Sequence, residues 1–182
     1  IARGLKNEPV AVFMKKAPKT IAAFFAVLYA GCYYVPLDAS MPLYRLQMIF
    51  EQLSPRAVVC DEASRELAER LSPEGSVISA SELFAVEENA AALAAVRAKC
   101  IDTDPAYIVF TSGSTGVPKG VTGCHRALID YANALCPVIG ADEESVSAMQ
   151  VPLYVDACMK ELLSVIKCGS TAYLMQQSMF LS

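Results

Sequence analysis

The chain alternates short apolar runs with longer segments that mix apolar and polar residues. An apolar run of about five residues is typical of a buried strand, whereas the mixed segments have the length of helices. The expected strands span residues 10–14, 33–37, 56–60, 106–110, 147–151 and 171–175. The expected helices span residues 20–30, 41–53, 63–71, 125–136 and 157–167. This alternation predicts an α/β fold with mainly parallel sheets flanked by helices.

Local signals mark several boundaries of these elements. Thr20 and Ser40 are expected to cap the helices that follow them, because short hydroxyl side chains accept hydrogen bonds from the first free backbone N–H groups. Gly31 is expected to end the first helix. Residues 79–100 are ambiguous, since their alanines favour a helix but part of the segment could be a linker.

The composition is apolar for one domain of 182 residues, with 54% hydrophobic and 19% charged side chains and a mean hydropathy of +0.38. Most elements should therefore be buried on more than one side, or the chain carries surface that the rest of a larger protein covers. The uncharged stretch 21–37 is short for a membrane span and is interrupted by Gly31 and Pro36. No membrane partner is expected.

Charge and cysteine usage exclude further classes. The net charge is −4 and there is no basic block, so nucleic acid is not an expected partner. Seven scattered cysteines with no Cys-x-x-Cys pair argue against a zinc site or a disulfide framework. Reduced, buried thiols in a cytoplasmic protein are expected instead. The N-terminal residues 1–6 have no feature of a signal peptide.

A loop rich in glycine and hydroxyl residues, Thr111–Gly120 (TSGSTGVPKG), follows the strand at 106–110. Glycines let successive backbone N–H groups turn into one concavity, hydroxyls add donors, and a lysine adds a positive charge. This chemistry suits phosphate. The candidate phosphate-binding residues are Thr111, Ser112, Gly113, Ser114, Thr115, Gly116 and Lys119.

The same loop is neither a Walker A loop nor a dinucleotide fingerprint. A Walker A loop has glycine directly before the lysine, but Pro118 precedes Lys119 here. The alternative to phosphate binding is a surface loop with no ligand, which is less consistent with the strong strand that leads into it.

The loop resembles the phosphate-binding motif of the adenylate-forming, AMP-binding enzymes. A second stretch, Leu28–Asp38 (LYAGCYYVPLD), followed by Pro42 and Arg45, is similar to the motif LKAGxAYVPLD of adenylation domains from nonribosomal peptide synthetases. The resemblance covers residues 1–182 and implies the large N-terminal subdomain of the acyl-CoA synthetase-like fold.

A third stretch, Pro152–Cys158, resembles the family's FDAS segment, with Val155 in place of Phe and Cys158 in place of Ser. The resemblance implies that Asp156 binds the α-ammonium group of an amino acid substrate. It also implies that Ala157 and Lys160 line the side-chain pocket, where a lysine would favour an acidic side chain. The alternatives are a helix-capping role for the aspartate and a solvated position for the lysine.

Other candidate residues have structural explanations that are favoured over functional ones. His125 is the only histidine and could act as a general base, but a structural place at the start of a helix is the preferred interpretation. Four tyrosines near the motifs are expected to be packing residues. They are Tyr33, Tyr34, Tyr107 and Tyr154.

The resemblance implies ATP-dependent activation of an amino acid carboxylate, with release of pyrophosphate and transfer to the phosphopantetheine thiol of a carrier-protein domain. The family's catalytic lysine and its adenine and Mg²⁺ ligands lie in motifs that this chain lacks. We therefore expect residues 1–182 to be a partial N-terminal subdomain without its own catalytic residue, inactive without the rest of the adenylation domain and its C-terminal subdomain. The alternatives are an acyl-CoA or aryl acid ligase, and a truncated, non-catalytic nucleotide-binding module.

Overall fold

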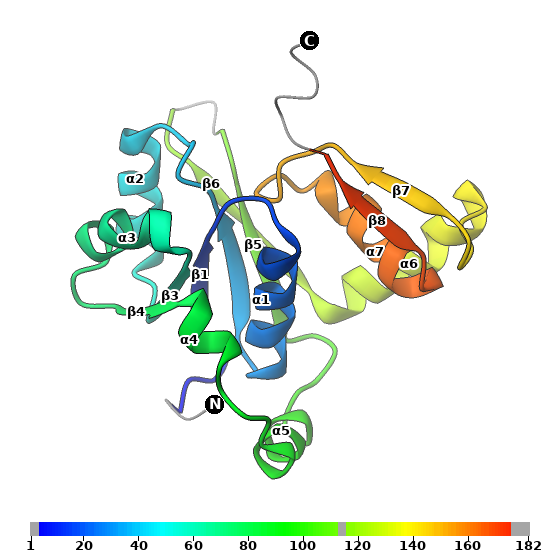
Figure 1. Cartoon of the computed structure of the whole chain (residues 1–182), viewed down its shortest axis with the longest axis horizontal. Helices are drawn as coiled ribbons and strands as arrows, with labels where there is room; N and C mark the ends of the chain where they lie inside the picture. Colours follow the sequence, from blue (N-terminus) through cyan, green and yellow to red (C-terminus); the bar gives the residue numbers. More distant parts are fainter. Residues whose placement is uncertain (1–3, 113–115, 176–182) are drawn as a thin grey trace.

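A computed structural model describes residues 4–112 and 116–175. Its main sheet has the strand order β4-β3-β1-β2-β5-β6 (Figure 1). The strands β1 to β5 are parallel, and β6 runs antiparallel to β5. Their bounds are β1 Pro9–Phe13, β2 Tyr33–Leu37, β3 Ala57–Cys60, β4 Ser76–Ser79, β5 Pro105–Thr111 and β6 Lys119–Cys124.

Helices cover both faces of this sheet because the central strands are apolar on both sides. Val10 and Val12 of β1 belong to one core, which includes Phe24 of α1. Ala11 and Phe13 belong to a second core, formed with α2 and α3. This alternation follows the two-residue period of a strand. The helices of this part are α1 Pro18–Tyr29, α2 Leu43–Leu53, the 3₁₀ helix η1 Glu62–Ser64, α3 Arg65–Leu71, α4 Ala80–Phe84 and α5 Ala90–Arg97.

A second, two-stranded parallel sheet is formed by β7 (Val146–Met149) and β8 (Thr171–Leu174) and lies with α6 (His125–Ile139) and α7 (Cys158–Cys168) beside the first sheet (Figure 1). Met149 of β7 and Met159 of α7 are buried in the same core as α1. Tyr34 of β2 joins the two parts: its ring stacks on Phe24 at 4.3 Å and its hydroxyl donates to Met159 Sδ at 3.4 Å. The two sheets therefore share one core.

The structure confirms the predicted α/β class and most predicted elements, and it corrects two caps. The first helix begins at Pro18 behind an extended Ala17, because proline fixes the φ of an opening turn. The Thr20 hydroxyl instead donates to the carbonyl of Lys15. Ser40 does not cap α2, which begins at Leu43; its N–H donates to the Asp38 carboxylate in a turn, at 2.7 Å.

Two strands, β4 and β6, extend the main sheet beyond the prediction, and the ambiguous segment 79–100 contains α4 and α5. All seven cysteines are free thiols, and the expected burial holds for four of them. Cys32, Cys60, Cys136 and Cys158 are buried, and the other three are partly exposed. Among the described helices, none has the length and apolar character needed to cross a membrane.

Candidate active site

A cavity of about 420 Å³ lies at the carboxyl end of β5. Three segments meet there: the turn that leads into α2, the end of β5, and the turn before α7. The carboxyl ends of parallel strands are the usual place for ligands in open α/β sheets. The cavity is lined by Ser40, Met41, Pro42, Arg45, Val109, Phe110, Thr111, Ser112, Tyr154, Val155 and Asp156.

The first two predicted phosphate-binding residues line this cavity; they are Thr111 and Ser112. Lys119 lies directly across the β5–β6 hairpin from Thr111, whose hydroxyl donates to the Lys119 carbonyl at 3.4 Å. Gly116 has φ +79°, a conformation that suits glycine, and both it and Lys119 are exposed. The predicted residues Gly113, Ser114 and Thr115 lie outside the described residues.

Asp156 reaches the same cavity from the other side, although 44 residues separate it from Ser112 in the chain. It lies in a turn before α7, and its carbonyl accepts the N–H of Met159 at 2.9 Å. Its carboxylate is near Tyr107 of β5: burial first, and then the negative charge of Asp156, raise the pKa of the Tyr107 hydroxyl. The structure thus brings together one predicted substrate residue and the beginning of the predicted phosphate loop.

Four further residues singled out from the sequence are not part of the cavity wall: Ala157, Lys160, His125 and Tyr34. Ala157 is partly buried at the start of α7, and Lys160 is exposed in the first turn of that helix. His125 begins α6, where its backbone N–H donates to the Asp104 carbonyl at 3.2 Å, in line with its preferred structural interpretation. Tyr34 is a packing residue as expected, since only 2% of it is exposed.

Sequence reasoning assigned no role to Arg45, although it recognised this residue as part of a motif. The guanidinium Nη2 of Arg45 donates to the Phe110 carbonyl at 2.8 Å, immediately before Thr111. Arg45 and Asp156 give the cavity wall one positive and one negative charge. The only sequence signal for this contact was the position of Arg45 shortly after the YVPLD stretch.

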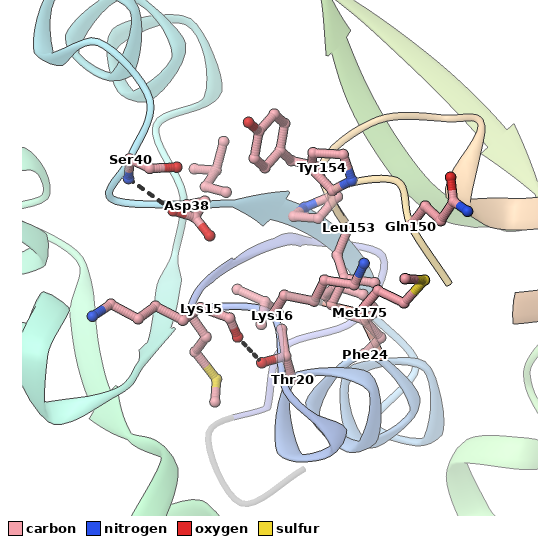
Figure 2. Close-up of a pocket in the computed structure, with 15 residues that line it drawn as sticks. Lys15, Lys16, Thr20, Phe24, Asp38, Ser40, Gln150, Leu153, Tyr154 and Met175 are labelled. Atoms are coloured by element: carbon pink, nitrogen blue, oxygen red, sulfur yellow. Dashed lines mark hydrogen bonds between the residues drawn. The ribbon is translucent and has the colours of Figure 1, made fainter. Parts of the chain in front are cut away.

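A second cavity, of about 210 Å³, adjoins the first, and the two share Ser40 and Tyr154 as wall residues (Figure 2). Lys16 crosses it from the end of β1 to the second sheet. Its Nζ donates to the carbonyls of Met149 and Val151 at 2.5 and 3.0 Å. Burial lowers the pKa of Lys16, while the nearby Glu161 and Cys158 act in the opposite direction. Lys16 therefore ties the main sheet to the segment that leads to Asp156.

The described residues contain no cluster of three or more histidine, cysteine, aspartate or glutamate side chains that could hold a metal ion.

The sequence matches the family described as AMP-binding enzyme over residues 1–182. The chain belongs to the AMP-binding enzyme family. The match confirms the resemblance inferred from the motifs at 28–38 and 111–120. It also agrees with the α/β fold described above.

Two curated relatives are similar to this AMP-binding chain over most of its length. It is 32% identical over 172 residues to the hybrid PKS-NRPS synthetase xenE of Xenoacremonium sinensis, covering 93% of the chain and 4% of that protein. It is 30% identical over 168 residues to the D-alanine–D-alanyl carrier protein ligase of Listeria monocytogenes serotype 4a, covering 91% of the chain and 32% of the ligase. The chain thus spans only a small part of each relative.

A solved structure shares the fold. The complex of VinN with 3-methylaspartate superposes with a TM-score of 0.79 at 22% identity, covering 94% of this chain and 48% of VinN. VinN has also been solved with L-aspartate. At this identity the similarity shows that VinN and the AMP-binding chain share a fold.

Proposed function

We propose that this chain supplies part of an active site that activates an amino acid carboxylate with ATP. The products would be an aminoacyl-adenylate and pyrophosphate, and the aminoacyl group would pass to the phosphopantetheine thiol of a carrier-protein domain. One observation carries the proposal: Asp156 and the first residues of the phosphate loop line one cavity. An amino acid held at one wall would have its carboxylate near a nucleotide held at the other.

The two walls would have different tasks. Thr111, Ser112 and the residues up to Lys119 would hold the β- and γ-phosphates, which leave together as pyrophosphate. Asp156 would pair with the α-ammonium group, because a carboxylate accepts charge-assisted hydrogen bonds from a cation. Catalysis of this kind depends mainly on positioning and on charge stabilisation. The proposed transfer to a carrier protein is supported by the names of the two relatives, a hybrid PKS-NRPS synthetase and a D-alanyl carrier protein ligase.

An acidic side chain on the substrate is a further part of the proposal. Lys160 lies exposed in the first turn of α7, four residues after Asp156, so its cation belongs to the helix that begins beside the cavity. The ligands in the two VinN complexes, 3-methylaspartate and L-aspartate, support the same preference. The residues 1–182 would remain a partial N-terminal subdomain, completed by the rest of the adenylation domain.

The test is amino-acid-dependent ATP–pyrophosphate exchange, measured on the complete adenylation domain that contains this chain. Asp156→Asn keeps the size of the side chain and removes its charge, so we expect the apparent KM for the amino acid to rise by about 100-fold. Asp130→Asn, an exposed aspartate on α6, is the matched control and should leave the kinetics unchanged.

The outcomes separate the three candidate functions. Exchange stimulated by aspartate or glutamate supports the proposal. Exchange stimulated only by carboxylates without an amino group, and insensitive to Asp156→Asn, would identify an acyl-CoA or aryl acid ligase. Nucleotide binding without exchange by any carboxylate would identify a non-catalytic module.

A further inference from the structure

Arg45 is placed in the cavity wall in an electrostatically unusual way. It lies in the first turn of α2, where the positive end of the helix dipole disfavours a cation. Its side chain crosses to β5, 65 residues further along the chain, and donates from Nη2 to the Phe110 carbonyl. Its Nε is buried and, among the described residues, has no hydrogen-bond partner. An exposed position at this helix end would avoid both costs.

Two other arginines of the chain, Arg126 and Arg65, pair with carboxylates. Arg126 donates from Nε and Nη2 to the two carboxylate oxygens of Asp102, each at 2.8 Å. Arg65 pairs with Glu69 and Glu82. Within the part of the chain that the structure describes, no carboxylate makes an ion pair with Arg45. Its interaction with a neutral carbonyl is therefore not explained by charge pairing.

The contact has a specific structural effect. Phe110 is the last residue before Thr111, and its own position in β5 is opposite Gly120 of β6. A carbonyl fixed by a planar guanidinium leaves little freedom to the peptide plane that follows it. The N–H of Thr111 belongs to that same peptide plane. Arg45 therefore holds the peptide between Phe110 and Thr111, where the sheet passes into the phosphate loop.

We propose that Arg45 is a positioning residue for the phosphate-binding loop. It holds the end of β5 so that Thr111 and Ser112 keep their places in the cavity wall, and its positive charge remains beside the part of the cavity that takes an anion. The proposal rests on the function proposed above for the same site. It predicts a defect in nucleotide use that is separate from amino acid recognition.

The first experiment needs no catalytic activity. Backbone amide hydrogen exchange is compared for the chain with Arg45→Met, Arg45→Lys and Arg70→Met, the last being an exposed arginine of α3. With Arg45→Met the amides of residues 109–112 should exchange about tenfold faster, while those of β1 and β3 stay unchanged. Arg45→Lys should restore much of the protection, since an ammonium can also donate to the carbonyl. Equal exchange at 109–112 in all variants would overturn the proposal.

The second experiment measures ATP–pyrophosphate exchange in the complete adenylation domain. Arg45→Met should raise the apparent KM for ATP about tenfold and leave that for the amino acid within about twofold, and Arg45→Lys should recover most of the loss. A merely structural role would alter both constants together, which would refute the assignment. If the unmodified protein supports no exchange, the proposed function fails, while the hydrogen-exchange result still decides whether Arg45 positions the loop.

Discussion

Replacing Lys16 by methionine removes the cation that joins the main sheet to the turn carrying Asp156. The substitution keeps an unbranched apolar stem of similar length, so packing is largely preserved. It removes two hydrogen bonds from Nζ, to the carbonyls of Met149 and Val151. In the variant the Met149 carbonyl still accepts a hydrogen bond from the N–H of Met175 at 3.1 Å. The loss of the Lys16 bond therefore affects the Val151 carbonyl more.

The size of the effect follows from these contacts. Hydrogen bonds from a charged donor contribute about 1.5–3 kcal/mol each. The desolvation that lowers the pKa of Lys16 opposes part of this gain. The two bonds together would contribute about 3–6 kcal/mol; after the desolvation offset and the discount for the partial exposure of Lys16, we expect Lys16→Met to lower the free energy of unfolding by about 2 kcal/mol. For a chain of this size this corresponds to a fall in Tm of about 4–8 °C.

The neighbouring lysine provides a matched control. The backbone N–H of Lys15 donates to Asp61 Oδ2 at 3.0 Å, and a side-chain substitution leaves that bond in place. Lys15→Met should therefore shift Tm by less than about 2 °C, as is usual for exposed surface substitutions. Thermal and urea unfolding of the two variants measure the difference. Equal stabilities would show that Lys16 contributes no net tie between the two sheets.

Two further predictions concern ionisation of buried groups. Burial raises the pKa of Cys158 to about 12 and that of Cys60 to about 11. Iodoacetamide at pH 8 should therefore label Cys100, Cys124 and Cys168 first and reach the two buried thiols only on unfolding, as measured by peptide mass spectrometry. Early labelling of Cys158 would contradict its burial. A thiol whose folded pKa lies above its unfolded value stabilises the fold fully below about pH 9 and loses that contribution as the pH rises toward 12. Urea unfolding should therefore show falling stability above pH 9, with a shallower fall in Cys158→Ala, and an unchanged slope in that variant would assign the effect to other groups.

The fold was predictable where burial on both sides produces apolar runs, as in β1 and β3. The strand β6 (KGVTGC) escaped prediction because it lies at the sheet edge, is mostly exposed and contains two glycines. Its strand conformation comes from pairing with β5, which local propensity does not encode. The cap at Thr20 was wrong because Pro18 starts the helix two residues earlier.

The candidate site was predictable only in part. Motif resemblance selected Thr111, Ser112 and Asp156, which the structure places around one cavity. Arg45 and Lys16 act through contacts with residues 65 and 133 positions away, to Phe110 and Met149. Contacts between residues so far apart in the chain are made by tertiary packing. A sequence pattern therefore indicates which residue types matter but does not identify their contact partners.

The shared core of the two sheets bears on how this region can be recombined with relatives. Met149, Leu153 and Met159 are buried against the α1 face of the main sheet, and Tyr34 reaches Met159 across the junction. A chimera joined between β6 and α6 would place side chains from two parents into one interior, where changes of a single methylene are felt. Exchange of a whole segment that includes both sheets preserves that interior, so the productive crossover points lie outside it.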